Sequence, residues 1–139
     1  MKRLEKNVTL ITGGGKGIGF GLASAFAREG SDIVITGRTE SRLIEAKKKI
    51  EDQYGVEVLA VVADGADEAQ IKGVIAQTIT KFGKINTLIN NAQASSSGLP
   101  LIEHTKKDFD LAINSGLYAT FFYMREAYPY LKETRGSVI

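Results

Sequence analysis

Residues 8–19, with the sequence VTLITGGGKGIG, constrain the fold more than any other part of the chain. A short apolar, β-branched run leads into the glycines, and residues 20–30 after them have the pattern of a helix that ends at a glycine. A strand, a glycine-rich turn and a helix in this order form a cradle for a dinucleotide. One glycine makes the tight turn, one lets the backbone approach a pyrophosphate, and a third lets the helix pack closely on the strand. The helix N-terminus then directs unpaired N–H groups and its positive dipole end at the phosphates.

A Walker-type phosphate loop is the main competing interpretation of these glycines. That loop needs four residues between its first glycine and a Gly-Lys-Ser/Thr sequence, whereas Lys16 here is followed by Gly17. A glycine-rich turn without a ligand is the plainer alternative, and the flanking strand and helix argue against it.

The composition restricts the classes of partner. A length of 139 residues suits one domain, residues 1–139, and a net charge of +2 is too slight to indicate a nucleic acid or a membrane surface. The chain has no cysteine and one histidine, His104, so we expect no disulfide, no thiolate catalysis and no bound metal. No apolar run reaches membrane-spanning length and the N-terminus lacks the apolar centre of a signal peptide, so we expect a cytoplasmic protein.

Strand-like and helix-like patterns alternate along the chain. Strands are expected at 8–12, 32–36, 56–62, 87–89 and 136–139, and helices at 20–30, 39–53, 67–82, 106–115 and 118–132. The nearly continuous apolar run at 56–62 predicts a strand covered on both faces, and Asp67 with Gln70 three residues later is typical of a helix N-cap.

This alternation indicates βαβ units, and therefore an α/β fold with a Rossmann-type, doubly wound parallel sheet that is truncated after about the fifth strand. The polar loop at 93–98 follows the fourth strand, at the edge where such sheets bind ligands, although a merely flexible loop has the same composition.

The chain resembles the N-terminal half of a short-chain dehydrogenase/reductase. Residues 12–19 match the family's TGxxxGxG motif, Asp64 after the third strand matches its adenine-contacting Asp, and Asn90-Asn91-Ala92 match the start of its NNAG stretch. The pattern continues through Phe109-Asp110, Thr120-Phe121 and Tyr128-Pro129. The resemblance thus covers essentially the whole chain and implies a nicotinamide cofactor.

The end of the second strand favours NADP(H) over NAD. An acidic residue there would accept hydrogen bonds from the ribose 2′-OH of NAD, but the position holds Gly37-Arg38, and Asp32 lies at the wrong end of the strand. Arg38 offers a planar donor fork to a 2′-phosphate and Lys16 adds a second positive charge. A surface arginine at the start of a helix, with no ligand, is the less favoured alternative. The candidate cofactor-binding residues are Gly13, Gly15, Lys16, Gly17, Ile18, Gly19, Arg38, Asp64, Asn91 and Ala92.

Three features depart from the family's pattern. Gln93 replaces the glycine of NNAG, which would alter the substrate side of the pocket without removing cofactor binding. The family has a catalytic Asn in the helix before the fifth strand, but a gapless match places Gly116 there, and Asn114 falls two residues early, about 200° around a helix. The sequence also ends at Ile139, before the family's catalytic Ser and Tyr-x-x-x-Lys.

Residues 128–132 match Tyr-x-x-x-Lys by sequence, with Ser115 upstream. The match lies before the fifth strand, whereas the family motif lies after it, and Pro129 is expected to interrupt the helix that would place Tyr128 and Lys132 on one face. We therefore assign no catalytic residue and expect the polypeptide 1–139 by itself to be inactive.

The resemblance implies hydride transfer between NADP(H) and a small-molecule carbonyl or alcohol substrate, with the family's Tyr as acid or base. Two alternatives stay open: an NADP(H)-binding sensor or regulatory module without turnover, and a fragment of an ordinary reductase. Open strand edges and exposed apolar helices recruit partners, and family members commonly assemble through the helix expected at 118–132, so we also expect a homo-oligomer.

Overall fold

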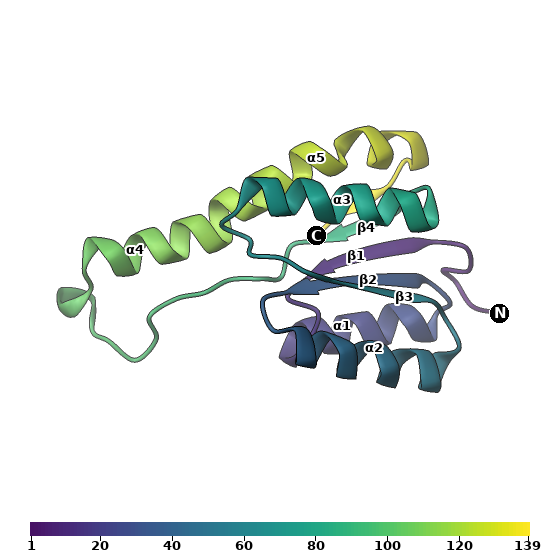
Figure 1. The fold of residues 1–139 in the computed structure, drawn as a ribbon, viewed down its shortest axis with the longest axis horizontal. Coiled ribbons are helices and arrows are strands. Elements are labelled where there is room, and N and C mark those ends of the chain that lie inside the picture. The colour runs from purple at the N-terminus through teal and green to yellow at the C-terminus, as the bar shows by residue number, and fades with distance from the viewer.

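Five parallel strands form the central sheet of the computed structural model, which describes all residues from Met1 to Ile139 (Figure 1). Their order across the sheet is β3-β2-β1-β4-β5, and every neighbouring pair is parallel. The strands are β1 (Val8–Thr12), β2 (Asp32–Gly37), β3 (Val58–Val62), β4 (Thr87–Ile89) and β5 (Ser137–Val138). The prediction of a doubly wound parallel sheet is confirmed.

Helices cover both faces of this sheet (Figure 1). One face carries α1 (Gly17–Arg28) and α2 (Glu40–Tyr54), and the other carries α3 (Glu68–Phe82) and α5 (Ala119–Thr134). The short η1 (Leu101–Glu103), α4 (Lys106–Ala112) and the π-helical η2 (Ile113–Tyr118) precede α5, and α4 projects well beyond the sheet.

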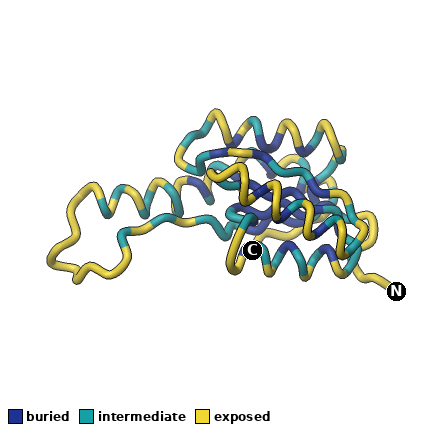
Figure 2. The backbone as a smooth tube through the Cα atoms, turned by 60° about the horizontal axis from the view of Figure 1, so that its bottom comes forward, coloured by how far each residue is buried: buried dark blue, intermediate teal, exposed yellow.

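The core consists of two apolar clusters, one on each face of the sheet. Successive residues of a strand point to opposite faces, so Ile11 and Ile35 pack toward α1 and α2, whereas Leu10 and Val34 pack toward α3 and α5. All four side chains are fully buried. Figure 2 shows this buried centre between the exposed outer surfaces of the helices.

Sequence predictions for the start of α3 and for β3 have different outcomes. The side chain of Asp67 accepts a hydrogen bond from Gln70 N at 3.2 Å, which confirms the predicted N-cap of α3. The prediction of a strand covered on both faces over 56–62 is wrong at both ends. The strand begins only at Val58, and Val62 is half exposed because β3 is the outermost strand on its side of the sheet.

The helical run before β5 also differs from the prediction. The helices expected at 106–115 and 118–132 are one continuous run, in which the π-helical η2 joins α4 to α5. Pro129 does not interrupt it, since α5 continues to Thr134. A proline removes one hydrogen bond from a helix, and here tertiary packing compensates: Tyr123, Ala127 and Leu131, at helical spacing on both sides of Pro129, are buried against the sheet and α3.

Candidate functional site

The turn between β1 and α1 has the geometry of an anion site. Gly13 and Gly17 adopt φ values of +66° and +54°, in the left-handed region that favours glycine. The N–H groups of Gly17, Ile18 and Gly19 have no hydrogen-bond acceptor within the protein, and the N-cap residue Lys16 makes no side-chain cap. These free donors and the positive end of the α1 dipole lie together at the C-terminal edge of the sheet.

The closest approach in this region is between α1 and the turn that precedes it. A Cβ atom at Gly19 would overlap the carbonyl oxygen of Gly13 and lie 2.6 Å from Nδ2 of Asn91. Gly19 is therefore a packing position, buried beneath the turn.

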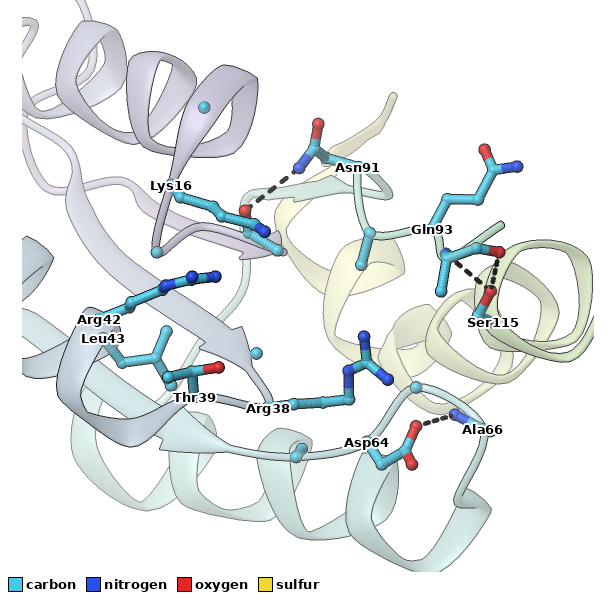
Figure 3. A pocket seen from close by; sticks show the side chains of 18 of the residues that line it. Lys16, Arg38, Thr39, Arg42, Leu43, Asp64, Ala66, Asn91, Gln93 and Ser115 are labelled. Carbon is cyan, nitrogen blue, oxygen red and sulfur yellow. Dashed lines mark hydrogen bonds between the residues drawn. The ribbon is translucent and has the colours of Figure 1, made fainter. Parts of the chain in front are cut away.

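Asn91 and Thr12 join the end of β4 to the glycine turn. The Thr12 hydroxyl accepts hydrogen bonds from the N–H groups of Asn91 at 3.0 Å and Ala92 at 2.9 Å. Asn91 Nδ2 in turn donates to the carbonyl oxygens of Thr12 and Gly13, at 3.1 and 3.3 Å. Asn91 thus holds the turn in place as well as facing the space beside it (Figure 3).

A cavity of about 520 Å³ opens between the glycine turn, the C-terminal strand ends and η2 (Figure 3). Its volume is in the range of ligand pockets. Nine of the ten candidate cofactor-binding residues line it, and Gly19 alone does not. The lining includes residues that the sequence analysis did not name for the cofactor: Gly37, Thr39, Arg42, Leu43, Ala63, Gly65, Ala66, Gln93, Ala94, Leu111, Asn114 and Ser115.

Positive charge gathers at one end of this cavity. Lys16, Arg38 and Arg42 line it, are exposed and make no salt bridge within the protein. Asp64 lies near Arg38, with its carboxylate held by a hydrogen bond from Ala66 N at 2.9 Å (Figure 3). Sequence reasoning missed Arg42. Its place in the first turn of α2, just after Arg38, was the feature of the sequence that could have pointed to it.

The other end of the cavity is uncharged and lies against η2. Asn114 and Ser115 line it, and Gly116 packs against the side chain of Gln93, whose Cγ is 3.6 Å from the position of a Cβ on Gly116. The two departures at 93 and 116 are therefore neighbours in space. π-Helical turns are frequent at functional sites, and this one places three consecutive residues beside the loop after β4.

The Tyr-x-x-x-Lys match lies elsewhere. Ser115 lines the cavity, but Tyr128 and Lys132 do not, and both are exposed on α5. Thirteen residues of helix separate Ser115 from Tyr128, which is about 20 Å at 1.5 Å per residue. The three side chains are not brought together. The buried tyrosine of the same helix is Tyr123, whose pKa burial raises to about 12.

The loop after β4 is also tied to the start of α4. Ser96 Oγ donates to Asp108 Oδ1 at 2.5 Å, and Asp108 Oδ2 accepts from both N and Oγ1 of Thr105, at 2.8 and 2.7 Å, in a capping box. These hydrogen bonds, first that from Ser96, lower the pKa of Asp108 to about 2.

The described residues contain no group of three or more His, Cys, Asp or Glu side chains that could hold a metal ion. None of the helices is both long and apolar enough to cross a lipid bilayer.

Comparison with known proteins identifies the family. The model of the short chain dehydrogenase family matches residues 7–139. The chain belongs to the short-chain dehydrogenase family. It is 55% identical, over 97% of its length, to a 12alpha-hydroxysteroid dehydrogenase from a Clostridium species, of which it covers 54%. The chain therefore spans about half the length of the curated relatives it matches.

Solved structures of longer proteins share the fold of this chain. L-sorbose reductase from Gluconobacter frateurii, in complex with NADPH and L-sorbose, is 29% identical with a TM-score of 0.91; the match covers 99% of this chain and 53% of that one. NAD+-bound xylitol dehydrogenase is 25% identical with a TM-score of 0.92, over 99% of this chain and 53% of that one.

Proposed function

We propose that residues 1–139 bind NADP(H) and form the cofactor-binding part of an oxidoreductase that transfers hydride between the nicotinamide and a carbonyl or alcohol substrate. The observation that carries this proposal is the combination of free N–H groups at the start of α1 with three unpaired cations around one cavity. The family membership and the NADPH complex of L-sorbose reductase support it.

The residues of the cavity fit the charged parts of this cofactor. Gly17, Ile18 and Gly19 offer N–H donors to a pyrophosphate, as the glycine turns of dinucleotide-binding folds do. The choice between NAD and NADP depends on β2, because solved relatives bind either one. Gly37 ends that strand without a carboxylate, and Arg38 and Arg42 follow it. Two guanidinium groups without a protein partner favour a 2′-phosphate over a 2′-hydroxyl.

For the substrate, the proposal names a chemical class and no single compound. When bound, the cofactor supplies or accepts hydride at the nicotinamide ring. The chain's own residues bind and orient it: the turn from Gly13 to Gly19 holds the phosphates, and Asn91 holds the turn. The 55% identity to a 12alpha-hydroxysteroid dehydrogenase favours a secondary alcohol, or the corresponding ketone, on an apolar ring system.

The test is a titration of NADPH and NADH against the parent protein and the variant Arg38→Asp. A carboxylate in place of the guanidinium would repel the 2′-phosphate, so NADPH affinity should fall about ten- to a hundredfold, and NADH affinity much less. Arg28→Asp, an exposed arginine on α1 outside the cavity, is the matched control. An unchanged NADPH to NADH affinity ratio in Arg38→Asp would show that Arg38 does not recognise the cofactor.

A further inference from the structure

A second, much smaller cavity lies between α5 and the C-terminal edge of the sheet. Its volume is about 20 Å³, which is room for one water molecule. The residues that line it come from the ends of β1 and β2, from the segments that follow β3 and β4, and from the first two turns of α5. The small cavity borders the large one, because both are lined by Gly13, Gly37, Ala63, Gly65 and Ala92.

Two polar atoms of residues at this small cavity have no partner within the protein. Thr36 is only 2% exposed and its Oγ1 makes no hydrogen bond, and the buried Oδ1 of Asn90 makes none either. Thr12, which pairs with Thr36 in the register of β1 and β2, differs: its hydroxyl accepts hydrogen bonds from the N–H groups of Asn91 and Ala92. Buried polar groups in native proteins are nearly always paired, either with protein or with water. A partner for Thr36 and Asn90 is therefore expected in the space that they line.

The hydroxyl of Tyr123 is a third polar group at this cavity. Tyr123 is 2% exposed, and its burial raises its pKa to about 12. The hydroxyl of Thr36 opposes part of this rise in the pKa, so the two hydroxyls are close to one another. Their positions nevertheless fall short of the geometry of a direct hydrogen bond. Two hydroxyls and one amide oxygen thus share a space of the size of one water molecule.

The chemistry of the lining favours water over other small ligands. A buried water molecule makes about three hydrogen bonds, as donor and as acceptor. The hydroxyls of Thr36 and Tyr123 can act in either sense, and Asn90 Oδ1 can accept. Calcium and magnesium ions take about six oxygen ligands, usually with carboxylates among them, and no charged residue lines this cavity. An apolar ligand would leave the two unpaired oxygens without a partner.

We propose that one buried water molecule bridges Thr36, Asn90 and Tyr123. In the sheet, β1 lies between β2 and β4, so the backbones of Thr36 and Asn90 are about two strand spacings, roughly 9–10 Å, apart. The water joins these two strand ends to α5. Gly37-Arg38 follow Thr36 directly and Asn91 follows Asn90, so the bridge fixes the two strand ends that lead into the large cavity. The site requires no cofactor and is independent of the proposed function.

A high-resolution crystal structure of the 1–139 protein tests the site directly. It should show one water molecule within hydrogen-bond distance of all three groups. The same site should have lost this water in the double variant Thr36→Val/Tyr123→Phe, in which Asn90 is the one remaining partner. A direct hydrogen bond between Thr36 and Tyr123 without water, or a cation at this point, would overturn the proposal.

Urea denaturation tests the bridge in solution. Thr36→Val, Asn90→Leu and Tyr123→Phe each remove one partner of the water at similar side-chain size, and each should raise the equilibrium constant for unfolding about two- to tenfold. Tyr128→Phe removes the hydroxyl of an exposed tyrosine from the same helix and is the matched control, which should leave this constant unchanged.

Double variants distinguish a bridging water from a direct bond. Thr36→Val and Asn90→Leu together should raise the unfolding constant by less than the product of their separate effects, because both changes remove the same bridge. If Thr36 instead bonds directly to Tyr123, only that pair will show such coupling. Independent effects of Thr36→Val and Asn90→Leu would therefore overturn the proposal. The cofactor titrations above would not be affected by this result, because neither measurement depends on the other.

Discussion

The glycine turn and the helical run of α4, η2 and α5 border the same cavity, but they are held in different ways. Around the turn, β1 is buried along its whole length, and Gly19 approaches Gly13 so closely that a methyl group does not fit. By contrast, α4 and η2 contain no buried residue, and the run exposes more than half of four large apolar side chains, Phe109, Leu117, Phe121 and Tyr128.

The conformations of these two regions therefore depend on different contacts. The conformation of the turn follows from contacts within residues 1–139, so a single added atom should disturb it. The helical run is set by its inner face and by a few hydrogen bonds to the loop after β4, while its outer face presents apolar surface of the kind that partners cover. Changes to the run should therefore affect assembly and local order more than folding.

The largest effect expected from this comparison concerns activity. The turn region supplies cofactor contacts, whereas Tyr128 and Lys132 of the helical run lie outside the cavity. General acid–base catalysis contributes roughly 10²- to 10⁴-fold, so we propose that purified polypeptide 1–139 will not turn over NADPH with any carbonyl offered. Absorbance assays with a ketone panel, on the parent and on Tyr128→Phe, test this. Turnover that survives in Tyr128→Phe would contradict it, and turnover abolished by that change would assign catalysis to α5.

The next largest effect is expected in the free energy of unfolding, when alanine replaces either of two glycines of α1. Gly19→Ala would force a Cβ onto the Gly13 carbonyl oxygen, and we expect the free energy of unfolding to fall by about 3 kcal/mol. Gly21→Ala is the control, because nothing lies within 4 Å of its Cβ, and a better helix former there should raise stability by about 0.5–1 kcal/mol. Urea denaturation of both variants measures the difference. Equal stabilities would mean that α1 does not pack on the turn as described.

A smaller effect is expected in self-association, which we propose for the exposed outer face of α5. Light scattering across a concentration series should show masses above the 15.0 kDa of one chain. Phe121→Ser, at an exposed position, should reduce this association and leave NADPH binding intact. A mass that stays at that of one chain up to high concentration would show that the exposed face of α5 does not drive self-association.

The smallest effect is local and depends on pH. Hydrogen bonds from Ser96 and Thr105 lower the pKa of Asp108 from its ordinary value of 3.8 to about 2, so its carboxylate stabilises the start of α4. This contribution is complete above the unfolded-state pKa and is lost as the pH falls from about 4 through about 2. An NMR titration should place the Asp108 carboxyl midpoint near 2 in the parent, and Ser96→Ala should move it upward. A midpoint near 3.8 in the parent would mean that the loop is not tied to α4.

Much of the fold follows from local features of the sequence. The glycine spacing at 13–19 and the alternation of apolar runs predict the order of strands and helices, because both report on backbone conformation and on which face of an element is buried. The N-cap at Asp67 was predicted for the same reason. Two features near the C-terminal part were not: the continuity of the helical run, and the tolerance of Pro129, which depends on packing against α3 and the sheet.

For the candidate site, sequence reasoning predicts the glycine turn, the arginine after β2 and the residues after β4, since each follows the end of a strand and parallel strands end at one edge. Three facts came from the folded structure alone: Gln93 and Gly116, distant in sequence, are in contact; Arg42 shares the cavity with Arg38; and Tyr128 and Lys132 do not reach that cavity. The physical reason is that periodicity fixes which way a residue faces on its own element, whereas the distance between two elements is set by how their side chains pack together.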